Sequence, residues 1–252
     1  MRGGENREKR LPVHWTVALT IMFMLACLVA AAAIGRMIYA ATKLEAALGQ
    51  AQSAATLPAP MPRDGRVRLV LFGDSRIVKW APVPKIVGTQ VLRLGRGGET
   101  TVEMSARAEA VIRAADPDIL VLQGGINDLV AAGLNPGRAE VLMVDVVQTL
   151  VALAGTGRAL GVQRVIIMTI VRPGRAPIWR WPFWSVEIPR LVERVNARLI
   201  RLAAAEGIEI LDADRLLAGP GDGALTPTMA LDTLHWRAEA YRRLNAALTD
   251  LL

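Results

Sequence analysis

An uncharged apolar run from Trp15 to Ala33 is the feature that most restricts what this chain can become. A bilayer core needs about 20 apolar residues at helical rise, and the apolar character resumes after Arg36, so the run is long enough to span. The preceding tail carries more basic than acidic side chains, which favours a cytoplasmic amino terminus. We therefore expect a cytoplasmic basic tail over residues 1–12, a retained transmembrane signal anchor over 13–41, and export of everything beyond it.

The rival interpretation is a cleaved signal peptide, because Ala30 to Ala33 offer small residues near a possible cleavage point. The run exceeds the usual length of a signal core, which favours the anchor. The expected location is the inner membrane of a bacterium, crossed once, with the folded part in the periplasm. Cys27, the only cysteine, lies inside the apolar run, so we expect neither a disulfide nor a cysteine metal site in the exported part.

Residues 42–64 are expected to form a stalk followed by a Pro/Ala-rich linker, and residues 65–252 to form one folded domain. The net charge of +7 does not predict nucleic-acid binding, because Lys and Arg are spread along the chain beside Asp and Glu rather than gathered in a run. This spread favours attraction to an anionic lipid or polymer surface instead.

Apolar runs alternate with amphipathic stretches through the folded domain. The predicted strands cover 66–72, 89–94, 119–123, 164–171 and 208–211, and the predicted helices cover 101–114, 138–159, 187–206 and 236–252. Alternation of this kind implies parallel pairing through right-handed crossovers. The expected fold is a three-layer α/β/α sandwich with a central parallel sheet of about five strands, and its sites belong at the loops after the strands.

Four of those loops supply polar groups that suit acyl transfer. A serine hydroxyl is a poor nucleophile until an imidazole takes its proton, and a carboxylate fixes the tautomer of that imidazole. The developing oxyanion needs donors, which glycine amides and an asparagine side chain can supply. The segments are Gly73-Asp74-Ser75, Gly95 to Thr100, Gly124 to Asp128, and Asp232 to His235.

The histidine count sharpens this expectation. His14 lies at the cytoplasmic edge of the anchor, so His235 is the only imidazole in the exported domain. Any histidine base must therefore be His235, with Asp232 three residues before it.

In order and spacing, these four segments resemble the signature blocks of the SGNH (GDSL-type) hydrolase superfamily, over roughly residues 66–248. The resemblance implies a flavodoxin-like fold with Ser75 as nucleophile, His235 as base and Asp232 as the orienting acid. It also implies an oxyanion hole formed by the amides of Ser75 and Gly98 and the side chain of Asn127. The sequence departs from the family pattern at Arg76, where an apolar residue is usual, and at Trp236, where a smaller one is common.

A Trp/Arg-rich insertion over residues 172–184 follows the fourth predicted strand and is expected beside the site. It could stack on sugar rings, grip an acyl chain or touch the membrane interface, and the alternative is a hydrophobic lid packed on the domain. We assign substrate contact to its tryptophans and to the two unusual residues of the signature blocks, which gives Arg76, Trp179, Trp181, Trp184 and Trp236.

Together these features predict a membrane-anchored, extracytoplasmic serine esterase that hydrolyses small O-acyl esters, with acetyl the expected acyl group and an envelope glycan the leading candidate for the alcohol part. Two alternatives remain open at this point: transfer of the acyl group to a sugar hydroxyl by the same residues, and a non-catalytic envelope scaffold that binds glycan or a membrane-protein partner. No cofactor and no metal is expected, because one histidine and no cysteine leave only carboxylate sites and no carboxylate cluster suggests one.

Overall fold

The structure of the protein is a computed structural model that describes residues 13–49 and 59–252. The chain divides into two compact units, Met1–Tyr39 and Ala40–Leu252. The expected basic tail and part of the expected linker lie outside the described residues. Helix α1 (Val13–Ala47) includes the long apolar run, and its side chains as far as Ala33 are exposed.

Two helical stretches of the described chain are long and apolar enough to cross a membrane, His14–Ala47 and Pro136–Ala159. The second lies within the folded unit and contributes buried side chains such as Val146 and Leu150 to its core. In the first stretch, no residue of the most apolar segment is buried. This stretch lies near the amino terminus, and a signal sequence there would have the same length and apolar composition.

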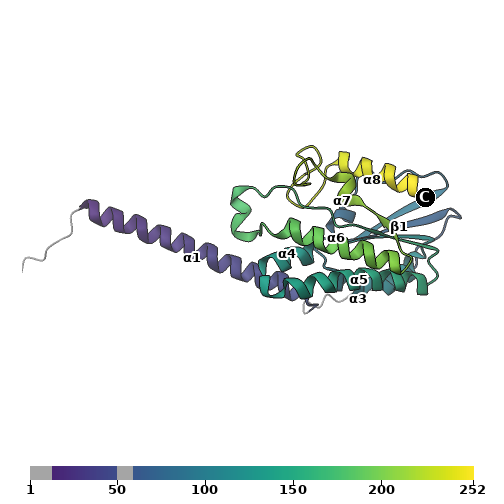
Figure 1. The fold of residues 1–252 in the computed structure, drawn as a ribbon, viewed down its shortest axis with the longest axis horizontal. Coiled ribbons are helices and arrows are strands. Elements are labelled where there is room, and N and C mark those ends of the chain that lie inside the picture. Colours follow the sequence, from purple (N-terminus) through teal and green to yellow (C-terminus); the bar gives the residue numbers. More distant parts are fainter. Residues whose placement is uncertain (1–12, 50–58) are drawn as a thin grey trace, which may run out of the picture. The chain divides into compact units, whose positions relative to one another are not determined.

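The second unit is built on a five-stranded sheet in the order β2-β1-β3-β4-β5, with every neighbouring pair parallel. The sheet strands alternate with helices along the chain (Figure 1). This arrangement confirms the predicted α/β fold with five parallel strands. The strands are β1 (Val67–Gly73), β2 (Thr89–Gly95), β3 (Ile119–Gln123), β4 (Arg164–Met168) and β5 (Glu209–Leu211).

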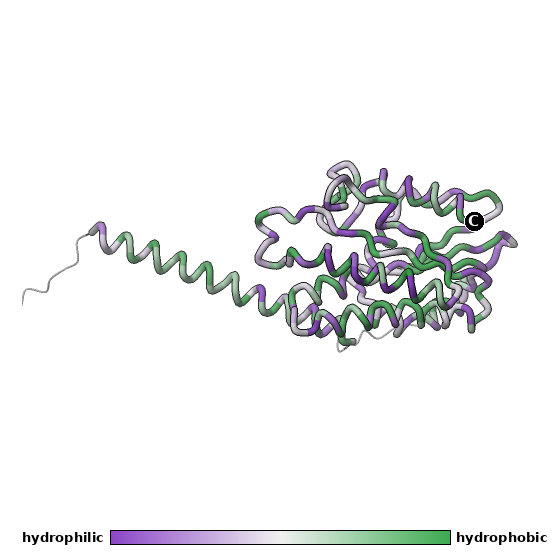
Figure 2. The backbone as a smooth tube through the Cα atoms, in the orientation of Figure 1, coloured by the Kyte–Doolittle hydropathy of each residue, from purple (hydrophilic) through white to green (hydrophobic). Residues whose placement is uncertain are grey.

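Both faces of the sheet are covered, because alternate residues of its central strands pack on different helices. Leu69, Leu71 and Val121 contribute to a core with α8, whereas Leu120 lies against α5. The hydrophobic colour follows the central strands (Figure 2). The covering helices are α3 (Thr101–Ala115), α4 (Ile126–Leu134), α5 (Ala139–Ala159) and α6 (Ile188–Ala205) on one face, and α7 (Ala213–Leu217) and α8 (Ala238–Leu251) on the other.

The fourth strand ends three residues earlier than the sequence suggests. Asn196 of α6 accepts a hydrogen bond from the N–H of Ile170 and donates one to its carbonyl, both at 2.8 Å. These two bonds replace those that a neighbouring strand would make, so the backbone N–H and carbonyl of Ile170 remain paired although the strand has ended. Short elements were not predicted: α2 (Ser75–Val78), α4, α7, and the 3-10 turns η1 (Pro136–Arg138) and η2 (Ile178–Phe183).

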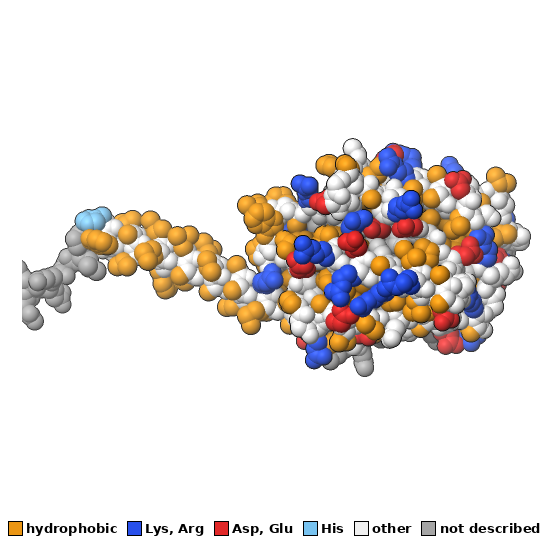
Figure 3. Space-filling model, viewed as in Figure 1, with side chains coloured by type: hydrophobic (Ala, Val, Ile, Leu, Met, Phe, Trp, Pro, Cys, Tyr) orange, Lys and Arg blue, Asp and Glu red, His pale blue; other side chains and the backbone are white. Residues whose placement is uncertain are grey.

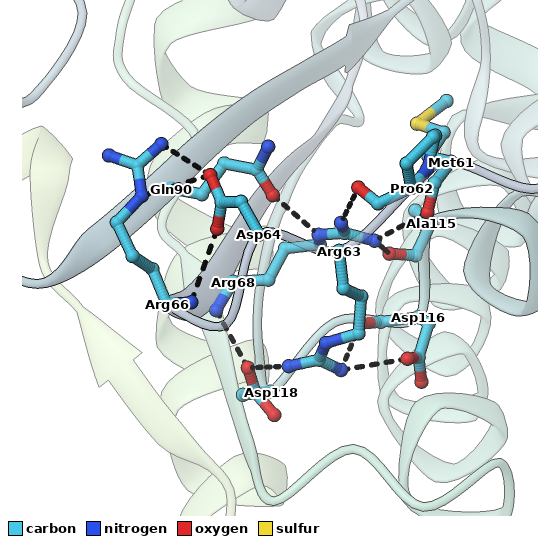
Figure 4. A network of polar contacts seen from close by, with 10 residues as sticks. All are labelled: Met61, Pro62, Arg63, Asp64, Arg66, Arg68, Gln90, Ala115, Asp116 and Asp118. Atoms are coloured by element: carbon cyan, nitrogen blue, oxygen red, sulfur yellow. Dashed lines mark hydrogen bonds and ion pairs between the residues drawn. The ribbon is translucent and has the colours of Figure 1, made fainter.

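The folded unit takes in chain that precedes Gly65. Ala47 is buried, and the carbonyl of Ala46 accepts a hydrogen bond from Thr100. Residues 61–64 are held at the edge of the sheet where the strands begin, around Arg68, as Figure 4 shows. The guanidinium of Arg68 is buried and donates to the carbonyls of Met61 (3.1 Å) and Ala115 (2.5 Å), so it fastens this segment at the edge opposite the polar loops.

Candidate active site

Ser75 lies where the strand order changes direction. Since β1 stands between β2 and β3, the loops after β1 and β3 diverge, and ligands of such sheets bind in the crevice beyond these carboxyl ends. A Cβ on Gly73 would lie 1.9 Å from the carbonyl oxygen of Gln123, and one on Gly95 would lie 2.8 Å from the carbonyl oxygen of Asp74. Glycine at both positions lets the serine turn sit directly against the two neighbouring strands.

Ser75, His235 and Asp232 form a continuous hydrogen-bonded chain, although 160 positions separate the serine from the histidine. The Nε2 atom of His235 lies 3.0 Å from Oγ of Ser75. Its Nδ1 atom lies 2.7 Å from Oδ2 of Asp232. This is the order and spacing that a hydroxyl, an imidazole and a carboxylate need for proton transfer from the hydroxyl.

A tight loop, rather than a helix start, holds the Asp/His pair. The N–H of Leu231 donates to the carbonyl of His235 at 2.9 Å, and Oδ1 of Asp232 accepts from the amides of Leu234 and His235 at 2.8 and 2.9 Å. Helix α8 begins only at Ala238. Partial burial acts to raise the pKa of Asp232, but the hydrogen bonds from His235 and from these amides outweigh it, so the pKa lies below its usual value and the carboxylate is ionised at neutral pH.

Donors suited to an oxyanion come from three loops. Ser75 begins α2 and Gly98 has a left-handed φ of 73°, and in the described part of the chain neither backbone N–H has a hydrogen-bond partner. Asn127, on the first turn of α4, uses one amide hydrogen to donate to the carbonyl of Glu99 at 2.9 Å. Its second amide hydrogen has no partner among the residues that the structure describes, so all three predicted groups retain a donor.

A buried ion pair braces the Gly98 loop, and sequence reasoning missed it. Glu99 binds the guanidinium of Arg107, which also donates to the carbonyls of Gly73 and Leu94, each at 3.3 Å. The same guanidinium lies 4.3 Å from the ring centroid of Phe72. The pair therefore ties the loop after β2 to the end of β1. The sequence alone does not indicate this ion pair. Glu99 and Arg107 lie eight residues apart, and that spacing predicts a contact only once helix α3 is known to lie between them.

Arg76 and Trp236 do not face a substrate, contrary to their assignment from the sequence. Their exposed fractions are 0% and 2%. Arg76 donates to the carbonyls of Leu234 (2.9 Å) and Val171 (3.1 Å), and its guanidinium lies 4.8 Å from the centroid of the Trp236 ring. The residues that follow Ser75 and His235 thus stack on each other beneath the site. Their contacts fix the serine turn against the histidine loop rather than select a substrate.

The tryptophans of the insertion take two different environments. Trp184 is buried at 9% exposure and stacks with Arg180 at 5.1 Å, which fits a packed lid rather than substrate contact. Trp179 and Trp181 are 77% and 62% exposed. Trp179 lines a cleft of about 740 Å³ that reaches Asp232, with Arg175 and Arg180 on the same wall.

The acidic residues around the site are engaged in internal contacts. Asp74 is buried, which raises its pKa, and it accepts from the N–H of Arg76 (2.8 Å) and from the amide of Gln123 (3.2 Å). Among the described residues, no group of three or more His, Cys, Asp or Glu side chains lies close enough to hold a metal ion.

Because of Asp128, the free energy of unfolding is expected to fall as the pH rises. Burial raises the pKa of Asp128 from 3.8 to about 7, although Thr101 donates to it through N–H and Oγ1. The folded chain therefore keeps a proton that the unfolded chain loses above about pH 4, and the free energy of unfolding falls by up to about 1.4 kcal/mol per pH unit until about pH 7. Asp128→Asn keeps an acceptor for Thr101 and removes this fall.

Urea unfolding of the full chain in mild detergent, from pH 4 to 8, measures the effect. The stability of Asp128→Asn relative to the unsubstituted chain should rise between pH 4 and 7 and then level off. A difference that stays constant over this range would contradict a protonated Asp128.

Comparison with known proteins places this site in a family. A family model described as GDSL-like lipase/acylhydrolase matches residues 72–243. A search of curated proteins found no match. Solved structures of the same fold include a GDSL-like lipase from Bacteroides thetaiotaomicron (19% identity, 84% of this chain and 97% of that chain, TM-score 0.60) and an acetylxylan esterase from Geobacillus stearothermophilus (18%, 77% and 95%, 0.55).

A carbohydrate acetylesterase family member from Sinorhizobium meliloti is also similar in fold, at 13% identity over 73% of this chain and 96% of that chain, with a TM-score of 0.56. The family model covers more than half of the sequence and includes the segments of Ser75, Gly98, Asn127, Asp232 and His235. The resemblance noted from the four sequence blocks is thereby confirmed, and the chain belongs to the GDSL-like lipase/acylhydrolase family of hydrolases.

Proposed function

We propose that the protein is a membrane-anchored serine esterase that cleaves small O-acyl esters through an acyl-Ser75 intermediate. The observation that carries the proposal is the chain of contacts from Ser75 through His235 to Asp232, at 3.0 and 2.7 Å. The proposal is also supported by two backbone N–H groups, those of Ser75 and Gly98, and one amide hydrogen of Asn127, which have no other partner among the described residues and so remain able to donate. The family supports hydrolysis as the reaction class.

In this mechanism Oγ of Ser75 attacks the ester carbonyl carbon while Nε2 of His235 takes the hydroxyl proton. Asp232 stabilises the imidazolium that forms. The carbonyl oxygen becomes an oxyanion and accepts hydrogen bonds from the amides of Ser75 and Gly98 and from Asn127. When the intermediate collapses, the alcohol leaves with the proton from His235, and His235 then activates a water that releases the carboxylic acid from Ser75.

For the substrate we propose an acetyl ester, with a glycan as the alcohol part. The cleft that reaches Asp232 offers an exposed aromatic face at Trp179 and two guanidinium groups, and an aromatic ring beside polar groups is suited to a sugar. The names of two structural neighbours, an acetylxylan esterase and a carbohydrate acetylesterase family member, agree with this choice.

For the location we propose that the apolar part of α1, residues 13–41, crosses the inner membrane of a bacterium once and that the folded unit works in the periplasm. The apolar part of α1 is uncharged over residues 15–33, and the tail before it carries four basic residues against two acidic ones. That imbalance keeps the amino terminus in the cytoplasm.

Labelling with a fluorophosphonate tests the proposed nucleophile, because this probe reacts with activated serines and needs no knowledge of the substrate. In mild detergent the full chain should become labelled, with the adduct on Ser75 by mass spectrometry. Ser75→Ala should abolish labelling, whereas Ser105→Ala, which alters an exposed serine of α3, should leave it unchanged. A folded wild-type chain that stays unlabelled would overturn the proposal.

A further inference from the structure

Four large apolar side chains are exposed within nine residues of the loop that links β4 to α6. They are Ile178 (68%), Trp179 (77%), Trp181 (62%) and Val186 (84%). Elsewhere in the described folded unit, exposed large apolar side chains are scattered singly, which is normal for a soluble surface. A cluster of exposed apolar side chains of this kind indicates a site of interaction with a protein, a ligand or a membrane.

The charge of this loop narrows the kind of partner. The segment 172–190 has four arginines and one glutamate. Arg175 and Arg190 have acids at 3.6 and 3.5 Å, yet their side chains are 86% and 79% exposed, so both remain accessible to an external anion. Tryptophan and arginine together are typical of the interface between lipid headgroups and acyl chains, where the rings sit at headgroup level and the cations meet phosphate.

The loop lies close to the point where the chain enters the folded unit. At the end of α4, the side chain of Asn135 donates to the carbonyl of Ala40, the first residue of this unit, at 3.2 Å. Two residues earlier, a Cβ on Gly133 would lie 3.0 Å from Cβ of Ser185 and 2.7 Å from a side-chain carbon of Ile188. The carboxyl-terminal end of α4 therefore contacts both Ala40, where the chain enters the folded unit, and the end of the loop between β4 and α6.

Electrostatics agrees with this proximity. Lys43, near the end of α1, interacts electrostatically with Arg180, so the loop approaches the last turns of this helix. In Figure 3 hydrophobic side chains gather at the end of the folded unit where this loop projects in Figure 1. Since residue 39 continues directly into the apolar helix, the end of the unit that carries this loop is also the end where the chain would leave the bilayer.

We propose that Ile178, Trp181 and Val186, with Arg175 and Arg190, form a membrane-docking surface that inserts at the headgroup level of the bilayer. The proposal rests on the membrane assignment of α1 under the proposed function but not on the esterase chemistry. The loop follows β4, at the same sheet edge as Ser75, so docking holds the candidate site next to the membrane surface. The substrate it reaches is then an ester carried close to that surface.

Depth-dependent fluorescence quenching tests the surface. In a Cys27→Ser background, single cysteines at Ile178→Cys and Val186→Cys carry an environment-sensitive fluorophore, and the full chain is reconstituted into phosphatidylglycerol vesicles with lipids brominated near the headgroup. An interfacial surface lies about 5–10 Å into the headgroup boundary, so quenching at both positions should exceed that of a control at least about threefold. The control is Val87→Cys, which is fully exposed at the opposite sheet edge.

Equal quenching at Ile178→Cys, Val186→Cys and Val87→Cys would overturn the proposal and would point to a protein partner, since these vesicles contain none. A chain that fails to enter the vesicles would overturn it as well. Fluorophosphonate labelling of the same samples reports on Ser75 separately. An active but undocked enzyme is therefore distinguishable from a docked but inactive one.

Discussion

His235→Ala is expected to lower kcat for a small aryl acetate by about 10⁴-fold or more. The structure offers no substitute base, because His14, the only other histidine, lies in the other unit. With the imidazole removed, Ser75 keeps its place, but no other side chain among residues 13–49 and 59–252 lies within hydrogen-bond distance of its Oγ to take the proton. Initial rates at saturating ester, measured on the full chain in detergent, give the loss directly.

Asp232→Asn should lose about 10³- to 10⁴-fold in kcat with a small change in KM. Asparagine can still accept from the amides of Leu234 and His235, so the loop should keep its shape. What disappears is the charge that fixes the tautomer of His235 and stabilises its protonated form. Asp250→Asn, at the exposed end of α8, is the matched control. Activity within tenfold of the unsubstituted chain would remove Asp232 from the proposed mechanism.

The parts of this protein that could be predicted from sequence are those that local chemistry decides. Buried parallel strands read as continuous Val and Leu, so β1 and β3 were predicted within a residue. His235 could be identified as the only candidate for a histidine base, because the chain has no other histidine beyond the anchor. The resemblance of the four sequence blocks then implied the contact of His235 with Ser75, and the structure brings the two side chains to 3.0 Å.

Long-range packing decides the parts that could not be predicted. Arg76 was assigned to substrate because it stands where the family usually has an apolar residue. Its true partners are the carbonyl of Leu234 and the ring of Trp236, both more than 150 positions away. Asn196 of α6 pairs with the backbone of Ile170, just beyond β4, by another contact between separate elements. No local pattern in the sequence indicates either arrangement, because each needs the tertiary fold to bring its partners together.

Asn127→Ala is expected to lower kcat by about 10²- to 10³-fold, because one donor to the developing oxyanion is lost while the ground-state ester is bound almost as before. KM should change little. Ser75 and His235 keep their contact, so fluorophosphonate labelling should slow without disappearing. Stopped-time assays with an aryl acetate, together with the labelling rate, separate this result from loss of the nucleophile.

Asn127 also donates to the carbonyl of Glu99, so a collapse of the Gly98 loop could mimic loss of a donor. Two comparisons separate these causes. Asn135→Ala removes an asparagine from the other end of the same helix, whose side chain bonds Ala131 and Ala40, and should leave kcat within about twofold, as surface changes usually do. The second comparison is between KM and kcat in Asn127→Ala itself. Loss of an oxyanion donor lowers kcat and leaves KM nearly unchanged, whereas collapse of the Gly98 loop would raise KM as well. A KM that rises as steeply as kcat falls would show that the residue supports the loop and does not bind the oxyanion.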